Sequence, residues 1–292
     1  MSRGVRVIGT VEQLRDLLRQ EVVDELILAM PLKKIENADK HISLAEDMGI
    51  KVRIMPDWQL HYLMYKPKIA MIRFEQFLQV PTMALHTTSS NEGALFFKTV
   101  ADFVLAGMAC LVLLPVFGLI ALGVKLSSKG PVFYAQERLG LYGRRFRLYK
   151  FRTMVQNADQ LLQELKSKNE VDGPVFKIKK DPRIVPLVGT FLRKTSLDEL
   201  PQLFNVLRGE MSIVGPRPPI PDEVDEYDIW QRRRLSMKPG LTCLWQIAPS
   251  RNDLSFEEWM HLDLKYIDNW SLGLDLKLIF STALVMLTGN GR

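Results

Sequence analysis

The sequence predicts an α/β protein with a small N-terminal parallel α/β unit, followed by a larger mixed α+β part that binds a membrane. Short apolar runs alternate with amphipathic segments over the first 55 residues, which is typical of a parallel sheet. Residues 104–124 then carry no charge, and strand and helix patterns punctuated by glycine and proline follow them. With 292 residues, of which 47% are hydrophobic, the chain has enough apolar material for two folded units.

The first unit is expected over residues 1–86. Three runs have strand character, VRVIG, VDELILAMP and IKVRIMP, and the two segments between them have helical periodicity. Gly9 ends the first run, but the G-x-G-x-x-G spacing of a dinucleotide site does not follow it. A packing or regulatory unit is therefore favoured, and it is also a candidate for holding a homodimer together. Residues 87–95 are expected to link this unit to a catalytic domain over residues 96–292.

The apolar run Val104–Val124 is long enough to cross a bilayer. Pro115 lies near its middle, where it removes a helix hydrogen bond and predicts a kink. A plain span would separate two parts that both have the composition of reduced, cytosolic sequence, with two cysteines and no disulfide framework. A helix-break-helix hairpin over about residues 98–125 would keep them on one side of the membrane. Composition supports the two alternatives about equally.

A strongly basic stretch, residues 125–152, follows the apolar run, with eight Lys or Arg against one acid, Glu137. Aromatic residues interleave with these charges, as they do in some nucleic-acid-binding proteins. Because the stretch adjoins an apolar segment, anionic lipid headgroups and phosphate-bearing substrates are the favoured partners, and we expect no nucleic acid. A solvated basic face is the alternative.

Residues 195–218, TSLDELPQLFNVLRGEMSIVGPRP, are the candidate site. The adjacent acids Asp198 and Glu199 suit a nucleophile beside a divalent metal ion, which can keep both carboxylates ionised near a polyphosphate. Arg217, between two prolines, is a pre-positioned fork for phosphate oxygens. Ser196 has capping-box spacing with Glu199, so the first turn of a helix would by itself account for both acids. The alternation in RLYKFRTM predicts a strand.

Three motifs carry a resemblance to a known family: KFRTM (150–154), the long block over residues 181–218, and KPGLTCLWQI (238–247). They resemble the bacterial sugar transferases called monotopic phosphoglycosyl transferases, or polyprenyl glycosylphosphotransferases, and the resemblance runs from about Phe96 to the C-terminus. The first unit looks like the latter half of the Rossmann-like domain of larger members. Those members begin with several transmembrane helices, which this sequence lacks, so a shortened member or part of a longer protein is expected.

The resemblance implies a re-entrant membrane helix that breaks near Pro115, where Leu114 replaces the usual serine. It also implies that Asp198 is the nucleophile and that Glu199 is its partner at Mg2+. Lys150, Arg193 and Arg217 match positions that handle phosphate, and Asp263 matches a further functional acid. Three residues are weaker candidates: Arg152, Asp263, and Arg251 in the loop PSRND, which could reach the nucleotide or sugar.

The expected activity is transfer of a sugar 1-phosphate from a UDP-sugar to polyprenyl phosphate, such as undecaprenyl phosphate, with release of UMP. The expected intermediate is a phosphosugar ester of Asp198, and the reaction would initiate cell-surface or exopolysaccharide synthesis. The expected location is the cytoplasmic leaflet of the bacterial inner membrane, with monotopic attachment and both termini cytoplasmic. A catalytically silent, nucleotide-sugar-binding regulatory membrane protein is the alternative.

Overall fold

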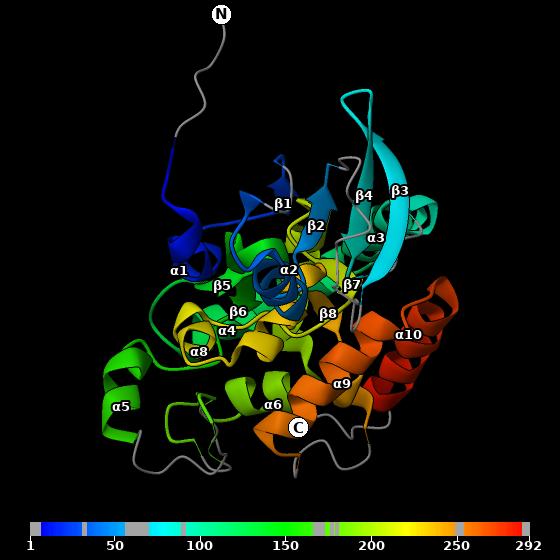
Figure 1. The fold of residues 1–292 in the computed structure, drawn as a ribbon. Coiled ribbons are helices and arrows are strands. Elements are labelled where there is room, and N and C mark those ends of the chain that lie inside the picture. The colour runs from blue at the N-terminus through cyan, green and yellow to red at the C-terminus, as the bar shows by residue number, and fades with distance from the viewer. Residues whose placement is uncertain are drawn as a thin grey trace, which may run out of the picture. The chain divides into compact units, whose positions relative to one another are not determined.

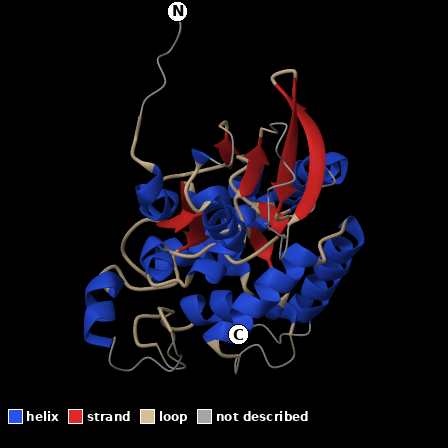
Figure 2. Cartoon of the chain, viewed as in Figure 1, coloured by secondary structure: helices blue, strands red, loops and turns tan. Residues whose placement is uncertain are grey.

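The chain folds into two compact units in a computed structural model, which describes residues 7–30, 34–55, 70–88, 92–165, 173–175, 178, 181–248 and 254–287. The first unit comprises residues 1–90 and two short later segments, 142–144 and 228–236. The second unit comprises residues 91–141, 145–227 and 237–292. Figure 2 shows helices and strands in mixture, as an α/β protein requires.

The first unit is built on a four-stranded sheet in the order β1-β2-β4-β3 (Figure 1). β1 (Glu25–Leu28) and β2 (Lys51–Ile54) pair in parallel, as the alternating pattern predicts. The helical elements in this unit are η1 (Val11–Gln13), α1 (Leu14–Gln20), α2 (Ala38–Asp47) and η7 (Ile229–Ser236). Their apolar side chains form one core with the sheet, which includes the fully buried Ile42, Val52 and Ile54.

An antiparallel hairpin makes the rest of this sheet, so the prediction of a purely parallel sheet is wrong. β3 (Met71–Phe77) and β4 (Val80–His86) form the long hairpin drawn in cyan in Figure 1, and β4 also pairs antiparallel with β2. Its two-residue turn uses Leu78 and Gln79, both at positive φ, where Asn-Gly or Asp-Gly is usual. Without those residues the turn gives no signal in the sequence.

The predicted first strand, VRVIG, is also wrong where the structure describes it. Residues 7–9 have no strand conformation, and the side chains of Val7 and Ile8 are 85% and 61% exposed. A short apolar run predicts a strand only if a neighbouring strand pairs with it, and here the sheet begins at β1.

Two small sheets and a set of helices make the second unit. β5 (Phe133–Leu139) pairs antiparallel with β6 (Arg145–Phe151), and β7 (Ser212–Val214) pairs in parallel with β8 (Gly240–Thr242). The motif LTCLWQI is thus a strand only at its start, because η8 (Trp245–Ile247) follows. The other helices of this unit are α3 (Glu92–Val112), α4 (Leu114–Ser127), α5 (Ala158–Leu165), α6 (Val188–Thr195), η6 (Leu197–Glu199), α7 (Gln202–Leu207), α8 (Pro221–Asp225), α9 (Phe256–Asp268) and α10 (Leu272–Leu287). The short turn η4 (Leu141–Gly143) begins in this unit, and its last two residues belong to the first.

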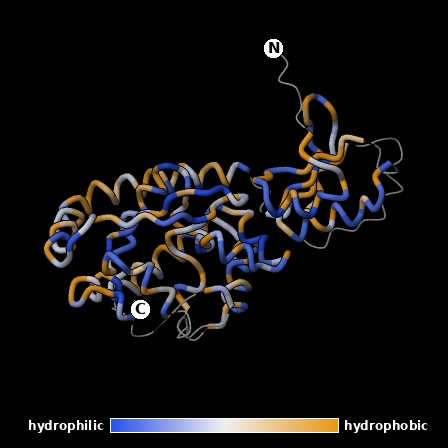
Figure 3. The backbone as a smooth tube through the Cα atoms, turned by 90° about the vertical axis from the view of Figure 1, so that its left-hand side faces the viewer, coloured by the Kyte–Doolittle hydropathy of each residue, from blue (hydrophilic) through white to orange (hydrophobic). Residues whose placement is uncertain are grey.

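The long apolar segment forms two helices, α3 and α4, which meet at Leu113. The break lies two residues before Pro115, which sits in the first turn of α4, where a proline costs no hydrogen bond. Among the described residues, α3 is the one helix long and apolar enough to cross a membrane. Many of its apolar side chains are exposed, including Phe96, Phe97 and Leu111. Figure 3, which colours the backbone by the hydropathy of each residue, shows hydrophobic stretches in orange on several helical turns.

A buried polar network fixes the start of α3 to the strand that leads into the candidate site. Lys98 of α3 donates to Asp275 of α10 at 2.6 Å and to the carbonyl oxygen of Val214 at 2.9 Å. Tyr266 of α9 donates to the same Asp275 at 2.7 Å, and burial raises the pKa of its hydroxyl. Each charged group has a partner, as a buried charge requires. The end of β7 is therefore held on several sides.

Candidate functional site

The acid pair lies on η6, a single 3-10 turn between α6 and α7. Ser196 does not cap a helix as its spacing predicts. It adopts the left-handed conformation, with φ of 56°, and ends α6 without a side-chain capping bond. The chain turns sharply there, and Asp198 becomes buried, with 6% of its surface exposed. The acids are thus placed by a turn between two helices, and helix capping does not account for them.

Lys150 on β6 contacts the acid pair directly, because its Nζ donates to Oε1 of Glu199 at 2.8 Å. The strand predicted for RLYKF is confirmed as β6, and its end brings Lys150 to η6. The two charged side chains are 25% and 18% exposed, so the pair lies at the boundary between core and solvent. A lysine that pairs with Glu199 counters the charge of that carboxylate and can also contact a phosphate that approaches it.

Asn205 of α7 holds β6 in this position, and sequence reasoning missed it. The Asn205 side chain is fully buried; it accepts from the backbone N–H of Tyr149 and donates to the carbonyl oxygen of Arg147 at 2.7 Å. These bonds satisfy the edge of β6 that is not paired with β5. An asparagine in an apolar helix pattern is its only signal in the sequence.

The Gly215–Pro218 turn is fixed by close contact between backbones. A Cβ on Gly215 would lie 2.3 Å from the carbonyl oxygen of Lys238, and a Cβ on Gly240 would lie 2.0 Å from the Gly215 nitrogen, so both positions require glycine. The Gly240 N–H donates to the Pro216 carbonyl oxygen at 2.9 Å. Arg217 leaves this turn and donates to the buried Glu223 at 3.2 Å. Glu223 thereby orients the guanidinium group.

Arg138 on β5 is a second residue that sequence reasoning missed. Its Nη1 donates to the carbonyl oxygen of Pro218 at 2.9 Å, which ties β5 to the Gly215–Pro218 turn. Burial lowers the pKa of Arg138 to about 10, and the charge of Arg217 adds to this effect, while Glu223 and Glu199 oppose it. Arg138 therefore shares one electrostatic environment with Arg217 and Glu199. In the sequence, Arg138 is one of eight basic residues in the stretch 125–152, and no motif distinguishes it.

The structure places the other predicted residues on separate elements. Arg193 lies in the last turn of α6, five residues before Asp198. Arg152 donates to the carbonyl oxygen of Ser128 at 2.8 Å and so fixes the end of α4. Asp263 is fully buried on α9. Arg251 lies outside the described residues.

Asp198 and Glu199 are the residues that would hold a Mg2+ ion together with a bound polyphosphate. Magnesium usually keeps several waters and takes one or two carboxylates together with substrate phosphates. Asp198 and Glu199 offer that number of carboxylates, and among the described residues no group of three His, Cys, Asp or Glu could form a closed metal cage. Because Lys150 holds Glu199, an ion at this carboxylate would have to share it with, or displace, the lysine.

The arrangement of these side chains is compatible with nucleophilic attack on a phosphorus atom. A carboxylate can act as a nucleophile when cations neutralise the phosphate oxygens. Asp198 offers such a carboxylate, and the neighbouring Glu199 pairs with the ammonium group of Lys150 on β6. Arg217, on the Gly215–Pro218 turn, is a second cation. The site also lies against apolar α4, because Leu197 and Leu200 pack with Val124 and Phe151.

Comparison with known proteins agrees with the resemblance seen in the motifs. The family model "Bacterial sugar transferase" matches residues 93–289. The chain is 49% identical over 162 residues to the galactosyl transferase CpsE of Streptococcus agalactiae, 39% over 218 residues to the undecaprenyl-phosphate galactose phosphotransferase of Salmonella typhimurium, and 34% over 283 residues to the UDP-glucose:undecaprenyl-phosphate glucose-1-phosphate transferase of Klebsiella pneumoniae.

These matches cover 56%, 73% and 94% of this chain and 36%, 45% and 57% of the three relatives. The chain therefore spans about a third to somewhat over half of their length. The family model covers more than half of this chain and includes the acid pair, Lys150 and Arg217. The chain belongs to the bacterial sugar transferase family.

Proposed function

We propose that this protein is a phosphoglycosyl transferase, which moves a sugar 1-phosphate from a UDP-sugar to polyprenyl phosphate and releases UMP. The observation that carries the proposal is the ion pair between Lys150 and Glu199 beside the buried Asp198, on a turn that packs against apolar α4. The name of the Klebsiella relative gives transfer of glucose 1-phosphate from UDP-glucose to undecaprenyl phosphate, and that of the Salmonella relative gives galactose phosphotransfer with undecaprenyl phosphate. The reaction would initiate synthesis of a cell-surface or exopolysaccharide.

In the first step, an oxygen of the Asp198 carboxylate forms a bond to the sugar-bearing phosphorus, and the bond from that phosphorus to the UMP oxygen breaks. In the second step, an oxygen of the lipid phosphate attacks the same phosphorus and the Asp198 carboxylate leaves. The products are UMP and a polyprenyl diphosphosugar, so no atom is lost. A carboxylate that acts twice at one phosphorus predicts ping-pong kinetics.

The side chains around Asp198 have separate parts in this scheme. Lys150 and Arg217 bind non-bridging phosphate oxygens, whose negative charge is spread over the transferring group. Glu223 and Arg138 hold the turn that carries Arg217. Asp198 and Glu199 would hold Mg2+, which supplies further neutralisation of the diphosphate when it is bound. Arg193 is a further candidate for the lipid phosphate because it follows the α6 face that packs on α4.

The membrane path is part of the same proposal. α3 and α4, broken at Leu113, would form a re-entrant hairpin that enters and leaves the cytoplasmic leaflet of the bacterial inner membrane. Both termini would then lie in the cytoplasm, and the lipid phosphate would meet the acid pair at the membrane surface. Tags at both ends of the chain should be protected together in sealed vesicles of right-side-out orientation. Opposite accessibility would show that the segment spans.

The decisive experiment supplies radiolabelled UDP-sugar and Mg2+ to the purified protein without any lipid acceptor. The expected result is up to one equivalent of UMP and protein that retains the sugar label. Asp198→Asn should show neither, because an amide cannot form the phosphate ester. Stoichiometric UMP release by Asp198→Asn would exclude Asp198 as the nucleophile. A silent nucleotide-sugar-binding regulator, the alternative, would bind the UDP-sugar and release no UMP in the wild-type protein.

A further inference from the structure

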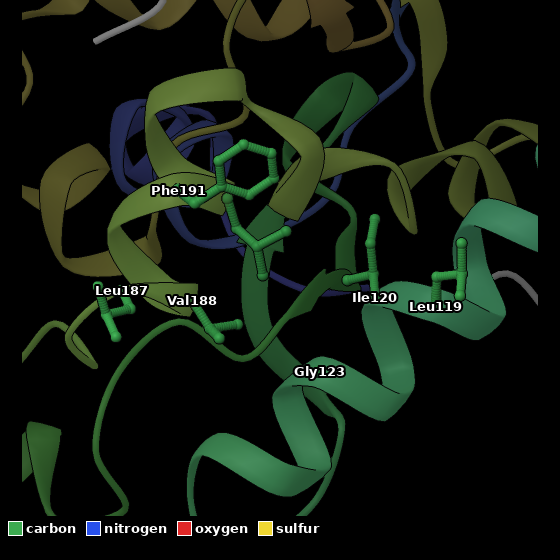
Figure 4. A pocket seen from close by; sticks show the side chains of 7 residues that line it. Leu119, Ile120, Gly123, Leu187, Val188 and Phe191 are labelled. Carbon is green, nitrogen blue, oxygen red and sulfur yellow. The ribbon is translucent and has the colours of Figure 1, made fainter.

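An apolar cavity of about 520 Å³ lies between α4 and α6 in the second unit. Figure 4 shows Leu119 and Ile120 of α4 opposite Val188 and Phe191 of α6. Its lining is Leu119, Ile120, Gly123, Leu187, Val188, Phe191 and Leu192. None of these residues has a polar side chain, so the cavity can hold only an apolar group.

The cavity is continuous with the packing beneath the acid pair. Ile120, Val188 and Leu192, which line it, belong to one hydrophobic cluster with Leu197 and Leu200. Leu197 directly precedes Asp198, and Leu200 directly follows Glu199. An apolar chain in the cavity would therefore lie against the same layer of side chains that supports the acids.

Helix α6 changes from apolar to basic along its length. Val188, Phe191 and Leu192 face the cavity, whereas Arg193 and Lys194 occupy its last turn. The helix has eight residues, so the two ends are separated by roughly 12 Å at 1.5 Å per residue. This arrangement matches an amphiphile whose hydrocarbon chain carries an anionic head at one end.

The outer side of the cavity is open to apolar surface. The side chains of Leu119, Leu187 and Phe191 are 71%, 86% and 57% exposed, and Leu122 and Leu126 of α4 are exposed beside them. Apolar surface of this extent costs free energy in water and marks a contact with lipid or another apolar partner. The membrane expected at α4 provides the route by which a hydrocarbon chain would enter.

We propose that the cavity is the subsite for the isoprenoid units that follow the phosphate of the lipid acceptor, an inference that rests on the proposed transferase function. A bilayer phospholipid fits the position less well. A lipid chain seated here directs its phosphate to Arg193, Lys194 and the acid pair, so a resident phospholipid would block the nucleophile. The polyprenyl phosphate is the lipid whose phosphate must reach that place for the reaction to occur. Gly123 makes room for its chain.

Two glycines of α4 give a matched test. A Cβ at Gly123 would have Val188 Cγ1 as its nearest neighbour at 4.0 Å, so Gly123→Leu introduces no backbone clash and projects into the cavity. A Cβ at Gly118 would meet nothing within 4 Å, and Gly118 does not line the cavity, so Gly118→Leu is the control on the same helix. Both changes raise helix propensity by the same amount.

The measurement is the KM for undecaprenyl phosphate and for dimethylallyl phosphate, which is too short to extend from the acid pair along α6. We expect Gly123→Leu to raise the KM for undecaprenyl phosphate about tenfold and to leave that for dimethylallyl phosphate unchanged, because only the long chain enters the cavity. Gly118→Leu should match the wild type with both acceptors. Equal KM values for undecaprenyl phosphate in the two variants would overturn the proposal.

A binding readout separates this inference from the proposed function. Undecaprenyl phosphate in detergent should raise the melting temperature of the wild type and of Gly118→Leu, and raise that of Gly123→Leu much less. If the wild type releases no UMP but shows this pattern, the transferase proposal fails and the lipid subsite stands. If Gly123→Leu instead loses only its flotation with phosphatidylglycerol vesicles that lack polyprenyl phosphate, a bilayer lipid fills the cavity and the subsite assignment is wrong.

Discussion

Two charged clusters in this molecule differ in what they join. On the sheet of the first unit, Glu75 contacts three basic side chains, with Lys51 at 3.0 Å, Arg53 at 3.1 Å and His86 at 2.6 Å. In the second unit, Lys150 of β6 pairs with Glu199 on the turn η6, next to the buried Asp198, and Arg217 pairs with Glu223. The first cluster holds strands of one sheet together, whereas the second gathers charged side chains at the candidate site.

The pKa of Glu75 reflects its contacts with these basic side chains. Burial by itself raises the pKa of this carboxyl group, but the hydrogen bonds from Lys51 and His86 outweigh burial and lower the pKa to about 2. Arg53 also bonds Glu25 and Thr82 and lies 4.8 Å over the ring of Phe77. The cluster thus joins all four strands of the sheet. The comparison teaches that this charged network serves the structure of the sheet, whereas the Lys150–Glu199 pair lies beside a buried carboxylate at the candidate site.

The largest expected effect is that of Lys150→Met, which removes the partner of Glu199 at the candidate site. The change keeps the length of the side chain and removes its charge, so kcat for sugar-phosphate transfer should fall on the order of 10²- to 10³-fold, as on loss of one oxyanion contact. The melting temperature should change little, because the pair with Glu199 is partly exposed. Steady-state kinetics and thermal unfolding measure the two effects on one sample.

Arg145→Met is the matched control for this change. Arg145 lies on the same strand and pairs with Glu137, but both side chains are largely exposed, so its loss should alter neither activity nor stability measurably. If Arg145→Met lowered kcat as much as Lys150→Met, the effect would come from general basic charge, and the distinction between the two clusters would fail.

The next largest effect is expected at Glu75, on the sheet of the first unit. Because the pKa of Glu75 is lowered from 4.5 to about 2 in the folded protein, its stabilising contribution is present above about pH 4.5 and is lost as the pH falls toward 2. Glu75→Gln should therefore cost on the order of 3 kcal/mol of unfolding free energy at pH 7 and flatten the acid limb of the stability curve. Denaturant unfolding between pH 2 and 7 measures both.

The catalytic constants of Glu75→Gln should equal those of the wild type per folded molecule, since Glu75 belongs to the first unit and the candidate site to the second. A loss of kcat larger than the loss of folded protein would mean that the charged network of the sheet serves the reaction as well.

The strand that bears Lys150 was predictable from the sequence, whereas much of the sheet of the first unit was not. The alternation in RLYKF is a local pattern, and the structure confirms it as β6. The roles of the acids, Lys150 and Arg217 stay predictions, and the turn at Arg217 is fixed by residues 238–240, which are distant in sequence. The hairpin of β3 and β4 was not predicted, because its turn residues, Leu78 and Gln79, are not the ones usual in such turns. Local patterns also failed at Ser196, where capping-box spacing predicted a helix start and the structure has a left-handed helix end.

The contacts that orient the site could not be predicted from the sequence, for another reason. Arg138 and Asn205 act on residues 80 and 56 positions away, at Pro218 and Tyr149. A pairing over such a distance depends on how helices and strands pack, and no periodicity or spacing encodes it. The sequence could therefore predict candidates for phosphate contact, and only the structure shows the groups that hold these candidates in place.

A substitution of Asn205 is expected to have a smaller effect, and it tests whether a contact between residues distant in sequence orients the site. Asn205→Ala removes the partners of the Tyr149 N–H and the Arg147 carbonyl oxygen, so it should cost about 1–3 kcal/mol of stability through unsatisfied backbone groups. It should also lower kcat, because β6 can then shift Lys150 away from Glu199. Asn205→Asp keeps the acceptor for Tyr149 but sets a carboxylate against Glu210 and the Arg147 carbonyl oxygen, so it should lose activity as Asn205→Ala does. Equal kcat in the wild type and both variants would show that β6 does not need this clamp.

Arg217→Lys is expected to have the smallest effect and distinguishes two uses of the same guanidinium group. The lysine keeps the charge but loses the planar fork, so contact with two phosphate oxygens becomes contact with one. We expect kcat/KM for the UDP-sugar to fall about tenfold, which corresponds to about 1.4 kcal/mol of transition-state binding. Stability should be nearly unchanged, because an ammonium group can still pair with the buried Glu223. Full activity in Arg217→Lys would mean that the reaction needs only a positive charge at this position, and that the planar fork of the guanidinium group has no part in it.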